Sequence, residues 1–331
     1  MTVVALIVSA FVVGAVEAFW RSRGHHPSVA DSESLWGWHR ERICRERGGL
    51  GVVLIGSSRI LTGFSTDAFR VRYPRVPIAQ LGIPECSPLE ILDDLAADGR
   101  FRGIVICELA DAAFLDTVRR KYGHQEYIDH SHRRTNRGEV LNLHCEAAVQ
   151  QLFCIRTPQL ALDQILYRGI ERGSLPDPFP WTMQFDRRQK ADYRGADAAQ
   201  LRALTLGKMH HWFQQNVNAV PTPRDWLQSA MRTQEGVRRI QDRGGLVVFV
   251  RFPSTDETWE LENRHFPKEE YWDRFAEKTS GVAIHFRDVP TLAKTECPDT
   301  SHIDYRDADG FTNRLMDEIQ RRRIREILIR P

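Results

Sequence analysis

The chain has 331 residues, of which 42% are hydrophobic and 27% are charged, and its formal net charge is +2. This composition is that of an ordinary globular protein, and it excludes both a disordered chain and a membrane protein with many spans. A nearly balanced charge supplies no broad basic field, so nucleic acid is not expected as a partner.

The first segment is the exception in composition. Val3 to Trp20 is almost wholly apolar, and its length is about the minimum for a helix that crosses a bilayer. No small-residue cleavage site precedes Arg21, which favours an uncleaved signal anchor over a removed signal peptide. We therefore expect residues 1–20 to form a single transmembrane anchor. A buried core helix is the alternative.

The charges beside this segment bear on its orientation. No lysine or arginine precedes it, whereas Arg21 and Arg23 follow it. Positively charged residues are normally retained on the cytoplasmic side of a membrane. Taken literally, this rule would keep the rest of the chain in the cytoplasm.

Short apolar runs and helical patterns alternate along much of the remaining chain. Residues 21–49 form a polar connector with an expected helix at about 34–46, and the main domain follows over 50–331. Runs this short and this apolar are typical of parallel strands buried on both faces. The sequence therefore predicts an α/β domain whose parallel sheet is covered by helices on both sides. The expected strands are 51–55, 78–81, 103–107, 246–250 and 282–286.

The alternation stops between the third and the fourth run. Residues 111–239 contain helical patterns and no clear strand, so we interpret them as a helical insertion. The final segment, about 309–328, carries Phe311, Leu315 and Ile319 four residues apart. This spacing predicts a last helix with one buried face.

Neither the cysteines nor the histidines form a pattern that indicates a metal or a cofactor. No two of the six cysteines form a CxxC pair, and the histidines at 124, 130 and 132 lack companion carboxylates. Cys86 and Cys297 lie near the motifs described next, and free thiols are favoured over a bridge between them. The cysteines are Cys44, Cys86, Cys107, Cys145, Cys154 and Cys297.

Three motifs stand where a parallel sheet would gather them. The first strand runs into Gly-Ser-Ser at 56–58, the second ends at Gly82, and Asp299 and His302 form an Asp-x-x-His turn before the last helix. Ligands of open α/β sheets bind at the carboxyl ends of the strands. A serine there needs a base, and Asp-x-x-His places a histidine beside a carboxylate that can orient it. Each motif alone is typical of a plain turn, and the three become specific only together and in this order.

In this combination the chain resembles the SGNH, or GDSL-like, hydrolase superfamily. The resemblance covers about 50–110 and 245–330, and it leaves out the insertion. Three blocks carry it: residues 55–58, 80–82 and 297–311.

The resemblance implies a three-layer, flavodoxin-like parallel sheet and assigns a role to each motif. Ser58 would be the nucleophile, His302 its general base and Asp299 the residue that orients the histidine. The backbone N–H groups of Ser58 and Gly82 would form the oxyanion hole. Neither a cofactor nor a metal is implied.

The Gly-Ser-Ser-Arg variant is similar to that of membrane-associated members that O-acetylate cell-envelope polysaccharides or act in D-alanylation of teichoic acid. It implies serine-dependent acyl transfer from an acyl-ester donor to a polysaccharide acceptor, with a membrane-bound acyltransferase as partner. The protein would then be anchored in the inner membrane with its catalytic domain on the periplasmic or extracellular side. A lipase or esterase, and a catalytically weak SGNH-fold scaffold or glycan-binding subunit, remain the alternatives.

One departure from the family pattern concerns the oxyanion hole. The third block usually ends in a glycine and an asparagine, whereas this chain has no asparagine at 107–111. Removing one oxyanion donor costs about 10²–10³ in rate in other enzymes. Arg59 is the auxiliary candidate, and a salt bridge from Arg59 to Glu108 or Asp111 is the alternative. We expect Glu108 either to point away from Ser58 or to pair with an arginine, because an unpaired carboxylate would oppose the oxyanion.

Overall fold

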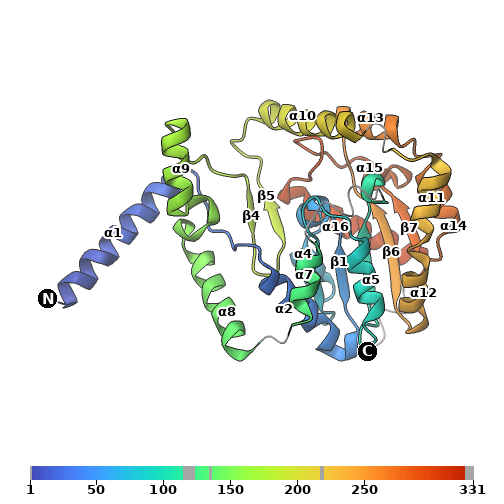
Figure 1. The fold of residues 1–331 in the computed structure, drawn as a ribbon, viewed down its shortest axis with the longest axis horizontal. Coiled ribbons are helices and arrows are strands. Elements are labelled where there is room, and N and C mark those ends of the chain that lie inside the picture. Colours follow the sequence, from blue (N-terminus) through green and yellow to red (C-terminus); the bar gives the residue numbers. More distant parts are fainter. Residues whose placement is uncertain (1, 115–123, 134–135, 217–219, 325–331) are drawn as a thin grey trace.

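The computed structural model describes residues 2–114, 124–133, 136–216 and 220–324. At its centre lies a five-stranded sheet in the order β2-β1-β3-β6-β7, and every pair of neighbouring strands is parallel (Figure 1). The expected α/β class and the parallel pairing are confirmed, and each strand end lies within one residue of its expected place. The strands are β1 (Val52–Ile55), β2 (Ile78–Gln80), β3 (Ile104–Glu108), β6 (Leu246–Arg251) and β7 (Val282–His285).

Both faces of the sheet are buried. Side chains alternate across a strand, so Val53 and Ile55 enter one hydrophobic core while Val52 and Leu54 enter the other. The first core is closed by α2 (Glu33–Arg45), α5 (Leu89–Ala97), α12 (Gln234–Asp242) and α14 (Trp272–Lys278). The second is closed by α3 (Ser58–Gly63), α4 (Thr66–Arg72), α15 (Pro290–Ala293) and α16 (Tyr305–Ile319). Helix α13 (Asp256–His265) follows β6.

Helix α16 has the buried face that the sequence predicts. Phe311, Leu315 and Ile319 are fully buried. The helix begins at Tyr305, four residues earlier than expected, because the Asp304 side chain accepts the backbone N–H of Arg306 and caps the first turn. Its expected end at about 328 lies outside the described residues.

Helix α1 (Thr2–Ser22) projects from the domain (Figure 1). It is the one helix, within the described residues, that is long and apolar enough to cross a membrane, and only 6% of its most apolar window is buried. This exposure contradicts the alternative of a buried core helix, and it is compatible with a signal anchor or a signal sequence. The connector is more ordered than its polar composition suggests, because α2 packs on the sheet through the fully buried Trp36.

The insertion is helical in the main, as expected, but it also contains strands. β4 (Trp181–Met183) and β5 (Gln189–Ala191) form an antiparallel hairpin, so the expectation of a strand-free insertion is wrong. The strands are only three residues long, and the turn between them depends on Arg187 at a φ of +66° rather than on a glycine. The helices are α7 (His124–Ser131), α8 (Arg137–Leu152), α9 (Leu162–Arg172), α10 (Ala198–Asn216) and α11 (Pro223–Met231).

Candidate active site

The strand order places a reversal of winding beside β1. From β1 the chain adds β2 on one side and then β3 on the other, so the direction of winding reverses between β1 and β3. Ligands of open α/β sheets bind outside the carboxyl ends of the strands at such a reversal. Ser58 begins α3 directly after β1, and Glu108 is the last residue of β3. The nucleophile candidate therefore lies where this fold class gathers its ligands.

Ser58, His302 and Asp299 form a continuous hydrogen-bonded chain. Ser58 Oγ lies 2.8 Å from His302 Nε2, and His302 Nδ1 lies 2.8 Å from Asp299 Oδ2. The other carboxylate oxygen of Asp299 accepts the backbone N–H groups of Ser301 and His302 at 2.9 and 2.7 Å. These distances agree with the geometry that the sequence predicts for a serine nucleophile, its base and the orienting carboxylate.

The surroundings of Asp299 favour its charged form. Burial by itself would raise the pKa of this carboxyl, but the hydrogen bonds from the His302 ring and from two backbone N–H groups hold the pKa below its usual range. An ionised Asp299 accepts a hydrogen bond from Nδ1–H of His302 and so leaves Nε2 as the nitrogen that can accept the proton of Ser58, as a general base must.

A tight turn presents Ser58. Gly56 has a φ of +151°, and a Cβ placed on it would lie 2.6 Å from Glu108 Cβ, so only glycine fits. Glu108 Oε2 accepts the N–H of Ser57 at 2.7 Å and its hydroxyl at 2.8 Å. The carboxylate thus bonds to Ser57, the residue before Ser58, and its other oxygen, Oε1, is buried without a hydrogen-bond partner among the described residues. That Glu108 points away from Ser58 stays a prediction. The two hydrogen bonds from Ser57 to Glu108 hold the turn that carries the candidate nucleophile, Ser58.

The second expected oxyanion donor is already engaged. The N–H of Gly82 donates to Gln80 Oε1 at 3.0 Å, and the amide of Gln80 donates to the Ile60 carbonyl. The fully buried Arg187 fixes the same segment by donating to the carbonyls of Gln80 and Gly82 at 2.8 and 3.0 Å. Gly82 can serve an oxyanion only by sharing its N–H with Gln80. The N–H of Ser58 opens α3, where backbone donors lack helical acceptors, and it is the better placed of the two.

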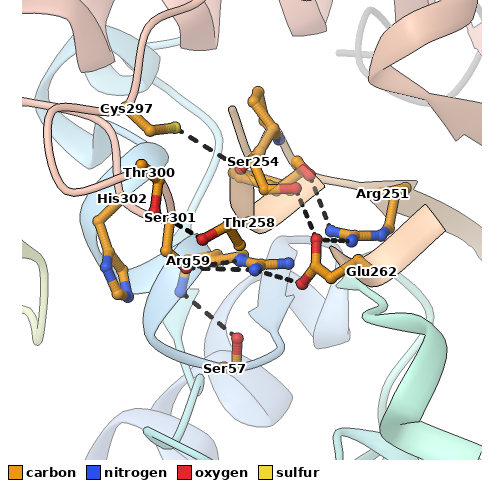
Figure 2. A network of polar contacts seen from close by, with 12 residues as sticks. Ser57, Arg59, Arg251, Ser254, Thr258, Glu262, Cys297, Thr300, Ser301 and His302 are labelled. Carbon is orange, nitrogen blue, oxygen red and sulfur yellow. Dashed lines mark hydrogen bonds and ion pairs between the residues drawn. The ribbon is translucent and has the colours of Figure 1, made fainter. Parts of the chain in front are cut away.

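Arg59 forms a salt bridge, but to Glu262 and not to Glu108. Its Nη2 pairs with Glu262 Oε1 at 2.6 Å, and its Nε donates to Ser301 Oγ at 3.2 Å. Figure 2 shows the His302 ring pointing away from this guanidinium. The alternative of a salt bridge to Glu108 is wrong because α13 supplies a buried carboxylate that pairs with Arg59, and the side chain of Asp111, the other partner named, lies outside the described residues. The auxiliary oxyanion role of Arg59 stays a prediction.

Glu262 is the centre of this polar network. Its Oε2 accepts Arg251 Nη2 and Ser254 Oγ, both at 2.6 Å (Figure 2). Burial would raise the pKa of Glu262, but the guanidiniums of Arg251 and Arg59 lower it to about 2. Arg59 follows Ser58 and Ser301 precedes His302, so the two hydrogen bonds from Arg59 to Ser301 Oγ join the segments that carry the candidate nucleophile and its base. Sequence reasoning missed Glu262 entirely.

The insertion contributes an aromatic wall that sequence reasoning also missed. The ring of Trp181 packs edge-on against His302, with centroids 4.5 Å apart, and Phe179 packs against Trp181 at 5.4 Å. Tyr193 is buried nearby, and burial together with the neighbouring Asp299 raises the pKa of its hydroxyl. The hairpin therefore covers the base, which the proline-rich sequence at 175–180 gave no reason to expect.

Other candidate groups stay apart from this site. All six cysteines are free thiols, as favoured for Cys86 and Cys297. His132 bonds to Asp94 at 2.6 Å, and His130 lies 3.2 Å from the Ser34 hydroxyl. Across the part of the chain that the structure describes, no group of three or more histidine, cysteine, aspartate or glutamate side chains is arranged to hold a metal ion.

No protein-family model matches this chain, and no curated protein matches it at a significant level.

Proposed function

We propose that the protein is a serine-dependent acyl-transfer enzyme of the SGNH type, built on a flavodoxin-like sheet and anchored by α1. The observation that carries the proposal is the chain from Ser58 through His302 to Asp299, with 2.8 Å at each step. It stands at the winding reversal of a parallel sheet, where ligand sites of such sheets lie.

The geometry supports a two-step reaction through an acyl-serine. Ser58 Oγ attacks the ester carbonyl of the donor while His302 Nε2 takes its proton. The negative charge on the carbonyl oxygen is met by the N–H of Ser58, His302 returns the proton to the departing alcohol, and the acyl group remains on Ser58. An acceptor hydroxyl then gives its proton to His302 Nε2 and attacks the acyl carbon, and His302 passes that proton to Ser58 Oγ as the bond between Ser58 and the acyl group breaks, which forms the new ester and restores Ser58.

The choice of donor and acceptor follows from α1 and from the family resemblance. The exposed apolar surface of α1 supports attachment to the inner membrane, where acyl donors are lipid-borne or delivered by a membrane-bound acyltransferase. The resemblance to envelope-polysaccharide O-acetyltransferases favours a sugar hydroxyl over water as acceptor. It also implies a domain on the periplasmic or extracellular side.

A fluorophosphonate probe tests the nucleophile. It reacts with serines activated by a base, so the intact protein in detergent should be labelled at Ser58, as located by peptide mass spectrometry. Ser58→Ala and His302→Ala should abolish labelling, whereas Ser229→Ala, in α11, should not. A folded wild-type protein that takes no label would refute the enzyme proposal.

One observation favours the rival function of a catalytically weak SGNH-fold scaffold or glycan-binding subunit. The N–H of Gly82 is occupied by Gln80, and the chain has no third-block asparagine. Gln80→Ala separates the two functions, because it frees the Gly82 N–H. Faster labelling of Ser58 in this variant indicates an active site limited by its oxyanion hole, and continued absence of labelling indicates a scaffold.

A further inference from the structure

Helix α9 carries an apolar face that no other part of the described chain covers. Leu162, Ile165, Leu166, Gly169 and Ile170 follow the i, i+3, i+4, i+7, i+8 spacing of one helix face. On the sheet-packed helices such positions are buried, as in α16, whereas on α9 Leu162, Leu166 and Ile170 are 71%, 53% and 82% exposed. A contiguous exposed apolar face on a folded protein marks a binding surface.

This face is continuous with the base of α1. Ile165 is the one partly buried member of the stripe, and it packs on the small core formed by Trp20, Cys154 and Leu160. Figure 1 shows α9 lying across the domain end of α1. The apolar surface of the anchor therefore passes directly into the apolar face of α9.

No polar spacer separates the anchor from the domain. Glu17, inside α1, accepts the backbone N–H groups of Cys154 and Ile155 at 2.9 and 3.1 Å, so the domain already holds the helix at that turn. Yet Val16 and Phe19, on the same turns, remain 42% and 46% exposed. Lipid that covers these side chains must also reach the domain surface beside them.

The polar neighbours of this surface suit a lipid headgroup layer. Arg23 follows the anchor and Arg156 lies in the 3-10 helix Cys154–Arg156, and both side chains are exposed. Arginines near the surface of an anionic leaflet are attracted by about 1 kcal/mol each. Apolar residues on one face and polar ones on the other are the features of helices that lie in the interface plane, about 5–10 Å deep.

We propose that α9 is an interfacial helix whose apolar face lies in the bilayer that holds α1. The inference rests on the membrane anchoring proposed above, and it is independent of the chemistry at Ser58. With α9 in the bilayer, the domain lies directly on the membrane surface and not at a distance from it. Phe179 and Trp181 line one pocket with His25, whose ring packs on Trp20 at the end of α1 with centroids 5.1 Å apart, so the wall over His302 then lies near the headgroup layer, on the side from which an amphiphilic acyl donor would come.

Environment-sensitive probes on α9 test this arrangement. The full chain is reconstituted in vesicles of phosphatidylethanolamine and phosphatidylglycerol, with Cys145→Ser removing the exposed cysteine. A nitrobenzoxadiazole label is placed at Leu166→Cys or Ile170→Cys. Gln164→Cys is the matched control, since residues two apart on a helix face nearly opposite directions. A label at Val12→Cys reports whether α1 is inserted.

We expect the labels at 166 and 170 to be quenched several-fold more by nitroxide-bearing lipids than by aqueous iodide, with the reverse at 164. Equal iodide quenching at 164 and 170, with position 12 in lipid, overturns the inference and leaves the anchor intact. Labels shielded from both quenchers overturn it in favour of a protein that covers α9. If position 12 is itself open to iodide, the membrane anchor fails, and the inference fails with it. Fluorophosphonate labelling in detergent reports on Ser58 separately from all of these outcomes.

Discussion

The carboxylate of Asp299 is the residue on which the tautomer of His302 depends. Asp299→Asn keeps the size of the side chain and an acceptor for the N–H groups of Ser301 and His302, but it removes the charge that holds the Nδ1 proton. In a serine protease the equivalent change lowers kcat about 10⁴-fold. We expect the rate of fluorophosphonate labelling at Ser58 to fall by about 10³–10⁴, with no loss of folded protein in a thermal melt. Asp307→Asn, an exposed change on α16, should label at the wild-type rate, and an equal fall there would contradict the assignment.

Substitutions of Glu108 provide a second test at the scale of one residue. Its charge lies beside the nucleophile turn, while its oxygen supplies the two bonds to Ser57. Glu108→Gln keeps an acceptor and removes a charge that would oppose the oxyanion, so Ser58 should be labelled at least as fast as in the wild type. Glu108→Ala loses both bonds, at about 1 kcal/mol each, and should slow labelling by about tenfold or more. If the glutamine variant is as slow as the alanine variant, the charge itself is required, and Glu108 does not act merely by fastening the turn.

At the scale of elements, the ion pairs of Glu262 connect α13 and β6 to the segments that carry Ser58 and His302, and their contribution to stability depends on pH. The folded pKa of about 2 lies below the ordinary value of 4.5. The stabilisation is therefore complete above about pH 4.5 and is lost as the pH falls from there toward 2. The shift corresponds to about 3 kcal/mol at most.

Removing the charge exposes this dependence. Glu262→Gln leaves Arg59 and Arg251 buried with a neutral neighbour, so at neutral pH it should destabilise the protein by about 3–5 kcal/mol. The difference in the free energy of unfolding between Glu262→Gln and the wild type should narrow as the pH falls below about 4, because the wild type then loses the same charge. Urea unfolding of the full chain in detergent measures the destabilisation at neutral pH and its change as the pH falls. Glu260→Gln, exposed on the same helix, is the control. A difference in the free energy of unfolding between Glu262→Gln and the wild type that stays constant down to pH 3 would count against the role assigned to the ion pairs of Glu262.

The elements that the sequence predicts well are those whose identity depends on burial. The five sheet strands are predictable because uninterrupted apolar runs such as Val52–Ile55 are typical of buried strands. Ser58 is located by the strand that it follows, and His302 by the last helix, which it precedes. The hairpin was missed because three residues cannot display alternation. Glu262 was missed because its helix is polar overall, although its place beside the buried Thr258 and Leu261 marks it as facing inward. The Gln80 bond to Gly82 could not be foreseen, since it depends on a rotamer.

At the scale of the whole molecule, the orientation of the domain decides which substrates it can reach. An acceptor on an envelope polysaccharide requires the domain outside the cytoplasm, whereas Arg21 and Arg23 oppose export. The structure gives Arg21 another reason to be present. It bonds to Glu17 at 2.6 Å and to the carbonyl of Leu152 at 2.7 Å, and so joins α1 to the domain.

We therefore expect alkaline phosphatase fused to the C-terminus of the full chain to be active, because this enzyme folds only where its disulfides form, outside the cytoplasm. A green fluorescent protein fusion at the same point should stay dark when exported through the general secretion route. Fusions to a chain lacking residues 2–22 provide the cytoplasmic reference, with inactive phosphatase and bright fluorescence. If the full-length fusions behave like that reference, the domain is cytoplasmic. Acyl transfer to a polysaccharide outside the cell is then ruled out, and Ser58 would have to act on an ester on the inner side of the membrane.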